Sequence, residues 1–176
     1  MRTLNLDYPA LLSLFPEHLN PKRSESASFL IWYLENYYRL DATEAVDSVC
    51  DNRGDKGVDG IFVNDNDKTI TVFQSAISQA VGKAIGDAVL REFAGTLSQF
   101  KDADTICKLD DSAGKAEVAK LVKRLELSSK IATHELRGEF LSNVKLDQNG
   151  KDFLEATPNI EFVGKSVLLS TYISDT

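Results

Sequence analysis

The sequence is short of cysteine and of basic residues, and each shortage narrows what the chain can be. Two cysteines in 176 residues are too few for a disulfide scaffold, so reduced thiols in a cytoplasmic protein are the simpler interpretation. Twenty Lys and Arg stand against 27 Asp and Glu, which gives a net charge of −7. That balance disfavours a protein that coats nucleic acid non-specifically, although it leaves room for a local basic groove.

Long apolar runs are missing as well. No stretch approaches the ~20 apolar residues of a membrane span. The first sixteen residues lack the apolar core of a signal peptide, because Asp7 and Pro9 interrupt them. Hydrophobic residues make up 43% of the chain, enough for one adequate core. We therefore expect a single soluble, cytoplasmic domain over residues 1–176, with no part in a membrane.

The spacing of apolar residues predicts alternating helices and strands. A helix is expected from Ser24, as its N-cap, to about Arg39. Residues 42–49 form either a short helix or a lead-in strand, and residues 101–113 are expected to be irregular. Later helices are predicted over 83–100, 115–127 and 148–155, strands over 135–143 and 160–163, and a helix or extended tail over 165–174. This order predicts an α/β fold with a mixed central sheet flanked by helices.

A β-hairpin is expected in the stretch from Asp55 to Ala76. Residues 64–68 have turn chemistry, and the residues on both sides alternate as strands do. If residues 65–68 form the loop, opposed residue numbers sum to 133, so Asn64 pairs with Thr69 and Asp59 with Gln74. Alternation then places Asp59, Gln74 and Ala76 on one face. A bulge near either glycine beside Asp59 would shift this register.

Asp59 and Gln74 on adjacent strands offer oxygen ligands of the kind that hold a divalent cation. Asp59 followed by Gln74-Ser75-Ala76 resembles the motif of the PD-(D/E)xK nuclease superfamily, which consists of Asp, then Glu or Gln, one residue, and Lys. The run Gly54 to Gly60 looks like its Mrr-type version. Over residues 24–105 the chain also resembles the N-terminal region of abortive-infection phage-resistance (AIPR) proteins.

The resemblance implies a restriction-endonuclease-like core that hydrolyses phosphodiester bonds of DNA in anti-phage defence, with RNA as the alternative substrate. It implies Mg²⁺ or Mn²⁺ held by Asp59, Gln74, the carbonyl of Ser75 and an acid from the first helix. Glu25 is the better aligned of the two glutamates there, and Glu35 is the other. The loop acids Asp51 and Asp55 are weaker candidates.

One position departs from the family pattern. Ala76 stands where the family has its lysine, so the cation that would assist charge build-up at the phosphate is missing. Either the lysine was replaced to silence the enzyme or the chain is naturally degenerate. The first is favoured because the rest of the motif is intact. Both explanations predict little or no cleavage by this chain.

Two other functional classes stay open. A nuclease-like fold without its lysine can serve as a nucleic-acid-binding or regulatory module. An acidic protein can instead be an interaction domain, as a homo-oligomer or beside a C-terminal regulatory domain or partner subunit. The five basic residues between Lys115 and Lys130 form either a solvated helix face or a DNA-backbone contact. The chain itself is either an excised N-terminal domain or a short natural protein.

Overall fold

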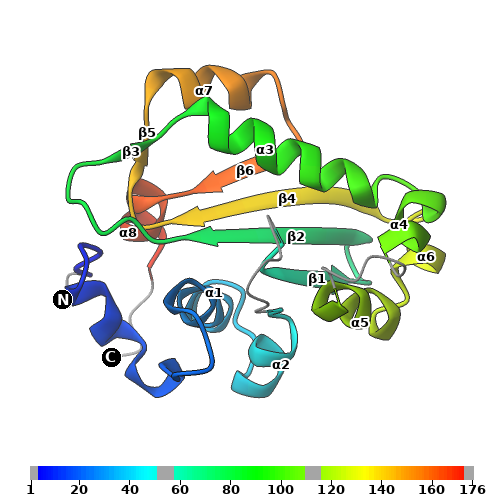
Figure 1. Cartoon of the computed structure of the whole chain (residues 1–176), viewed down its shortest axis with the longest axis horizontal. Coiled ribbons are helices and arrows are strands. Elements are labelled where there is room, and N and C mark those ends of the chain that lie inside the picture. Colours follow the sequence, from blue (N-terminus) through cyan, green and yellow to red (C-terminus); the bar gives the residue numbers. More distant parts are fainter. Residues whose placement is uncertain (1–3, 51–57, 110–115, 173–176) are drawn as a thin grey trace.

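A computed structural model describes residues 4–50, 58–109 and 116–172. Its centre is a mixed four-stranded sheet with the order β1-β2-β4-β6, seen nearly edge-on in Figure 1. The first pair is antiparallel and the other two are parallel. The strands are β1 (Gly60–Asn64), β2 (Thr69–Ala76), β4 (Glu135–Ser142) and β6 (Ile160–Val163). A second, two-stranded sheet pairs β3 (Ala84–Ile85) with β5 (Lys145–Leu146).

Strands β1 and β2 form the predicted hairpin. Their pairs run from Gly60 with Phe73 to Asn64 with Thr69, and every pair sums to 133 as expected. The Asn64 side chain accepts the backbone N–H groups of Asn66 and Asp67, which closes the loop. Because β4 pairs with β2 in parallel over eight residues, the hairpin lies firmly in the sheet.

Helices cover both faces of the sheet, and each face has its own core. On one face, α1 (Glu25–Asn36) packs its apolar stripe against Phe73, Leu141 and Val163. On the other, α3 (Asp87–Leu97) packs Phe93 against Phe140. Figure 1 shows α3 and α7 (Gln148–Glu155) above the sheet, and α1 and α2 (Ala42–Asp47) below it. The chain is thus a mixed α/β fold with helices on both sides.

The remaining helices are short. The 3-10 helices η1 (Ala10–Leu14) and η2 (Pro16–His18) lead into α1, and α8 (Lys165–Thr171) follows β6. Figure 1 shows α4 (Ala103–Leu109), α5 (Ala116–Arg124) and α6 (Leu127–Lys130) gathered at the end of the sheet where β2 and β4 begin. No helix within the described ranges is long and apolar enough to cross a bilayer.

Several predicted boundaries are confirmed and others are wrong. Ser24 caps α1 as expected, since its hydroxyl accepts the Ala27 N–H, but the helix ends at Asn36 and Arg39 adopts a positive φ of 59°. The helix predicted from Lys83 begins only at Asp87 and passes into η3 (Ser98–Phe100), because residues 84 and 85 join the small sheet. The predicted irregular stretch contains α4, which buries Ile106 and Leu109. A left-handed Glu126 separates α5 from α6.

Candidate functional site

The predicted site lies where the hairpin ends, and a β-bulge shapes it. The Asp59 N–H donates to the Phe73 carbonyl at 2.7 Å, although Phe73 already pairs with Gly60. Two residues therefore oppose one, which is the signature of a bulge. A side chain at position 60 would meet the Ser48 carbonyl at 2.9 Å, so the close approach of the two backbones requires glycine there.

The bulge shifts the register by one residue at the most important position. The predicted pairing of Asp59 with Gln74 is wrong, because Asp59 instead bonds to Phe73. Beyond the bulge, Val58 belongs to the core on the α3 face, where regular alternation from Ile61 would have turned it away. Because side chains alternate along β2, Gln74 is on the same face as Val72 and Ala76, whose side chains pack against the core on the α3 side.

The Asp59 carboxylate lies at the edge of β2. Its Oδ2 accepts the backbone N–H of Ser75 at 2.7 Å. If the ladder continued regularly, the carbonyl of Val58 would accept this N–H instead. Ser75 in turn donates its hydroxyl to the carbonyl of Ser26 at 2.8 Å. The hairpin end and the first turn of α1 are thereby tied together. This site therefore offers the half-buried carboxylate of Asp59, next to the Ser75 backbone N–H and the first turn of α1.

Glu25 lies next to Ser26 in that first turn, but its carboxylate has another partner. Both of its oxygens are within 3.3 Å of the Tyr8 hydroxyl, which donates to them. This bond raises the pKa of Tyr8. Of the predicted ligands, Asp59 and Ser75 are therefore in direct contact. Glu25 is the sequence neighbour of Ser26, which bonds to Ser75, and Gln74 lies on the other face of the sheet. Asp51 and Asp55 lie outside the described residues.

In the part of the chain that the structure describes, one trio of possible metal ligands comes together elsewhere. Ligand atoms of Glu17, His18 and Glu35 lie within 4.8 Å of one another. The buried His18 ring hydrogen-bonds to Glu35, with Glu17 3.8 Å away. The bond between His18 and Glu35 joins η2 to α1. Mg²⁺ prefers oxygen ligands, so a trio with an imidazole does not match the predicted ion.

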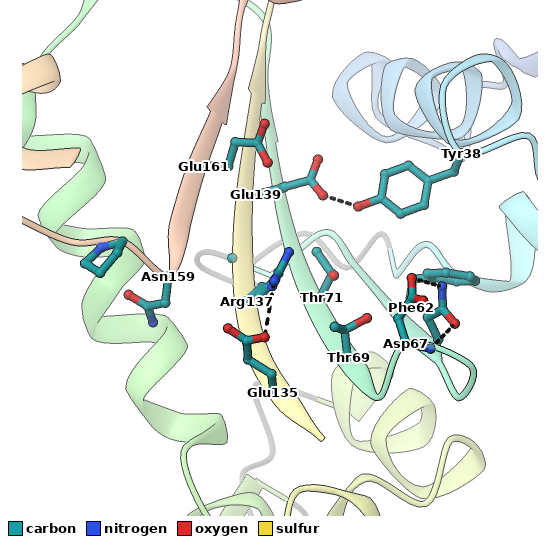
Figure 2. Close-up of a pocket in the computed structure, with 13 residues that line it drawn as sticks. Tyr38, Phe62, Asp67, Thr69, Thr71, Glu135, Arg137, Glu139, Asn159 and Glu161 are labelled. Atoms are coloured by element: carbon teal, nitrogen blue, oxygen red, sulfur yellow. Dashed lines mark hydrogen bonds and ion pairs between the residues drawn. The ribbon is translucent and has the colours of Figure 1, made fainter. Parts of the chain in front are cut away.

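The structure also contains a polar cavity that the sequence did not suggest. It has a volume of about 520 Å³ and lies on the α1 face of the sheet, beyond the end of that helix. Figure 2 shows its side chains projecting from β2, β4 and β6 towards Tyr38. Helix α1 ends at Asn36, and none of the described residues that line the cavity lies in a helix.

Glu139 is the innermost carboxylate of the cavity. It is 8% exposed, and its two oxygens accept hydrogen bonds from Tyr33, at 2.6 Å, and from Tyr38. Burial raises the pKa of Glu139, the two phenols act to lower it, and the neighbouring Glu161 raises it further. Burial and the same carboxylate raise the pKa values of both tyrosines well above their usual range.

Sequence reasoning missed this cavity for an identifiable reason. The alternation of Glu135, Arg137 and Glu139 along β4 is the pattern of a solvated strand face. Only the parallel pairing of Glu139 with Glu161 brings the two carboxylates side by side, and that pairing joins residues of two separate strands. The rings of Tyr33 and Tyr38 pack in the core beside α1, and no pattern in the sequence shows where their hydroxyl groups point.

Comparison of the chain with protein-family models, with curated proteins and with solved structures returned no match. The resemblance to PD-(D/E)xK nucleases therefore rests on the motif residues themselves.

Proposed function

We propose that this chain is a nuclease-like domain of the PD-(D/E)xK type that does not cleave phosphodiester bonds as it stands and serves as a nucleic-acid-binding or regulatory module in anti-phage defence. The observation that carries the absence of cleavage is the bulge at Asp59. The bulge directs the Asp59 carboxylate to the Ser75 amide, whereas Gln74 lies on the opposite face of the sheet, towards the α3 core. With Ala76 in place of the family's lysine, neither the ion-holding pair nor the cation is assembled.

The proposed partner is DNA, with RNA as the alternative, and the surface that would meet its backbone lies on α5. Lys120 and Lys123 are exposed there, away from the buried Val118 and Leu121. Lysines on one helix face can neutralise phosphates even in a protein of net negative charge.

A second candidate is the metal-dependent nuclease itself, with Mg²⁺ or Mn²⁺ bound by Asp59, Gln74, the Ser75 carbonyl and Glu25. The specific support is that Asp59, Ser75 and the start of α1 come together through two hydrogen bonds. In this form the bound ion would polarise the phosphoryl oxygen and activate a water molecule. The end of the hairpin would have to rearrange so that Gln74 joins Asp59.

One cleavage experiment separates the two candidates. The present chain, Ala76→Lys, and Ala76→Lys combined with Asp59→Ala are incubated with plasmid DNA and Mg²⁺. The module predicts no cleavage by any of the three. The nuclease predicts cleavage by Ala76→Lys and its loss in the double variant. If Ala76→Lys cuts DNA in an Asp59-dependent way, the silent-module proposal is wrong.

A binding experiment tests the module directly. Fluorescence anisotropy with a labelled DNA duplex is measured over a series of salt concentrations. Removing one phosphate contact, as in Lys123→Gln, should lower the slope of log K against log salt by about 1. Lys151→Gln, exposed on the distant helix α7, is the matched control and should leave the slope unchanged. Equal effects of the two variants, or no binding at low salt, would remove the nucleic-acid role.

A further inference from the structure

The polar cavity on the α1 face has the size of a small-molecule site. Its volume of about 520 Å³ falls in the range of roughly 300–1,000 Å³ that small ligands occupy in proteins. It opens between the ends of β1, β2, β4 and β6, so rigid strands supply most of its wall. A pocket built on strands holds its polar groups in fixed positions, which favours selective binding.

The charge of the wall is strongly unbalanced. Four carboxylates line the cavity, those of Asp67, Glu135, Glu139 and Glu161, and one cationic side chain does, that of Arg137. Arg137 donates to Glu135 at 3.2 Å, so its charge is already paired. Glu139 and Glu161 face the hollow from neighbouring strands, and the hydrogen bonds to Glu139 come from two neutral phenols.

A buried carboxylate beside a second one is unfavourable unless a positive charge compensates. At 8% exposure, water does little to screen Glu139. Two phenol donors stabilise its anion but leave the net charge of the cavity unchanged. A cation entering the cavity would supply what the wall lacks, whereas a phosphate or another anion would be repelled. This site is therefore separate from any track for nucleic acid.

The spacing of the acids favours an organic cation over a metal ion. Among the described residues, the trio at His18 is the only group of three such ligand atoms within 4.8 Å, and the acids of the cavity form no such group. They are too dispersed to surround one small ion. The rings of Tyr38 and Phe62 also line the hollow, 5.6 Å apart and edge to face. Aromatic rings beside carboxylates attract ammonium and guanidinium groups.

We propose that this cavity binds a small organic cation, an amine or guanidinium compound, with Glu139 and Glu161 as its counter-charges. Glu139 is the fixed inner carboxylate, oriented by Tyr33 and Tyr38. Glu161 is the outer, exposed one and meets the ligand at the mouth. Thr69 and Thr71 on β2 supply hydroxyl groups along the wall for a second polar end of the ligand.

The test uses 1,4-diaminobutane as probe, with isothermal titration calorimetry on the whole chain. We expect saturable binding with a Kd of about 1 mM or tighter. Glu161→Gln should weaken it about tenfold, because one of two counter-charges is lost from a partly desolvated site. Glu155→Gln is the matched control, since Glu155 is exposed on α7 against the other face of the sheet. It should change the Kd less than twofold.

Two further measurements exclude a general response of an acidic protein to positive charge. The neutral analogue 1,4-butanediol should give no saturable heat, and Mg²⁺ at equal ionic strength should not compete with the diamine. Amide shifts in an NMR titration should concentrate at Thr71, Arg137 and Glu161. Equal weakening by Glu155→Gln and Glu161→Gln, binding of the diol with the same Kd, or amide shifts spread over the whole surface would each overturn the proposal.

Discussion

Two carboxylates on the α1 side of this molecule are held in contrasting ways. Asp59 accepts a hydrogen bond from the Ser75 backbone N–H where the pairing of β1 with β2 ends, and its carboxylate takes the place of a backbone carbonyl. Glu139 lies in the middle of the sheet and accepts hydrogen bonds from the hydroxyls of Tyr33, in α1, and Tyr38, just beyond it. The motif of the sequence points to Asp59, yet Glu139 lines a cavity of about 520 Å³. The carboxylate that the sequence motif marks is therefore not the carboxylate that lines the cavity.

The comparison also shows how one sheet face divides into two regions. Under α1 the face is apolar, with Phe73 and Leu141 buried. Beyond the helix it is polar, and Thr71, Arg137 and Glu139 line an open hollow. The length of α1 decides where the change occurs. If this division is real, the two carboxylates should differ in how much each one contributes to stability.

Replacing Glu139 by leucine should have the largest effect on stability. The change leaves the phenols of Tyr33 and Tyr38 without their acceptor, and each unsatisfied group costs about 1–3 kcal/mol. We expect the free energy of unfolding to fall by roughly 2–4 kcal/mol in urea denaturation. Changing both tyrosines to phenylalanine in the same chain should recover much of the loss. A fall below about 1 kcal/mol would show that the phenols find other partners.

Replacing Asp59 should lower the free energy of unfolding less than replacing Glu139 does. Asp59→Ala removes one acceptor from a partly buried backbone amide and should lower the free energy of unfolding by about 1–2 kcal/mol. Asp59→Asn keeps an acceptor oxygen and should cost clearly less. If the two variants are equally unstable, charge and not hydrogen bonding is what holds the hairpin end, and the contrast with Glu139 disappears.

Ser75→Ala should have a smaller effect again. It removes the hydrogen bond to the Ser26 carbonyl, whose expected contribution is about 1 kcal/mol, and leaves the Ser75 amide bonded to Asp59. Hydrogen exchange at the first turn of α1 should quicken more than exchange near Tyr33. Uniform acceleration along the helix would mean that its two ends are not anchored separately.

The smallest expected effect is on the pH dependence of stability. Because the pKa of Glu139 is raised in the folded state, the folded chain binds more protons than the unfolded chain between the two pKa values. The stability associated with this group is complete below the unfolded pKa, about 4.3, and is lost as the pH rises through the folded value. Glu139→Gln should therefore show a shallower decline over this interval in urea unfolding. Parallel curves for the two proteins would contradict the raised pKa.

Much of the fold could be predicted from the sequence because its signals are local. Turn residues and alternation were enough for the hairpin register, and helical spacing was enough for α1, α5 and α7. The errors arose where tertiary contacts decide. Residues 84 and 85 leave a helical pattern to pair with β5, and α4 forms in a polar stretch because Ile106 and Leu109 meet a core. Neither partner is visible from nearby sequence.

The candidate site was harder to predict than the fold. The approach of Asp59 to the end of β2 follows from the hairpin, but a single bulge decides which residue it contacts. Glycine on one side of Asp59 permits that bulge without requiring it. The cavity is lined by residues of four strands and by Tyr38, which follows the end of α1, so no single motif could reveal it.

Helix α1 connects the two carboxylates, since Ser26 bonds to the hairpin at one end and Tyr33 bonds to Glu139 further along. Seven residues, or about 10 Å of helix, separate these two positions. In a genetic screen, random changes within α1 would impair both regions together and would be hard to assign to either. Substitutions at strand positions separate the two regions, because Glu161 belongs to the cavity alone and Ser75 to the end of the hairpin alone.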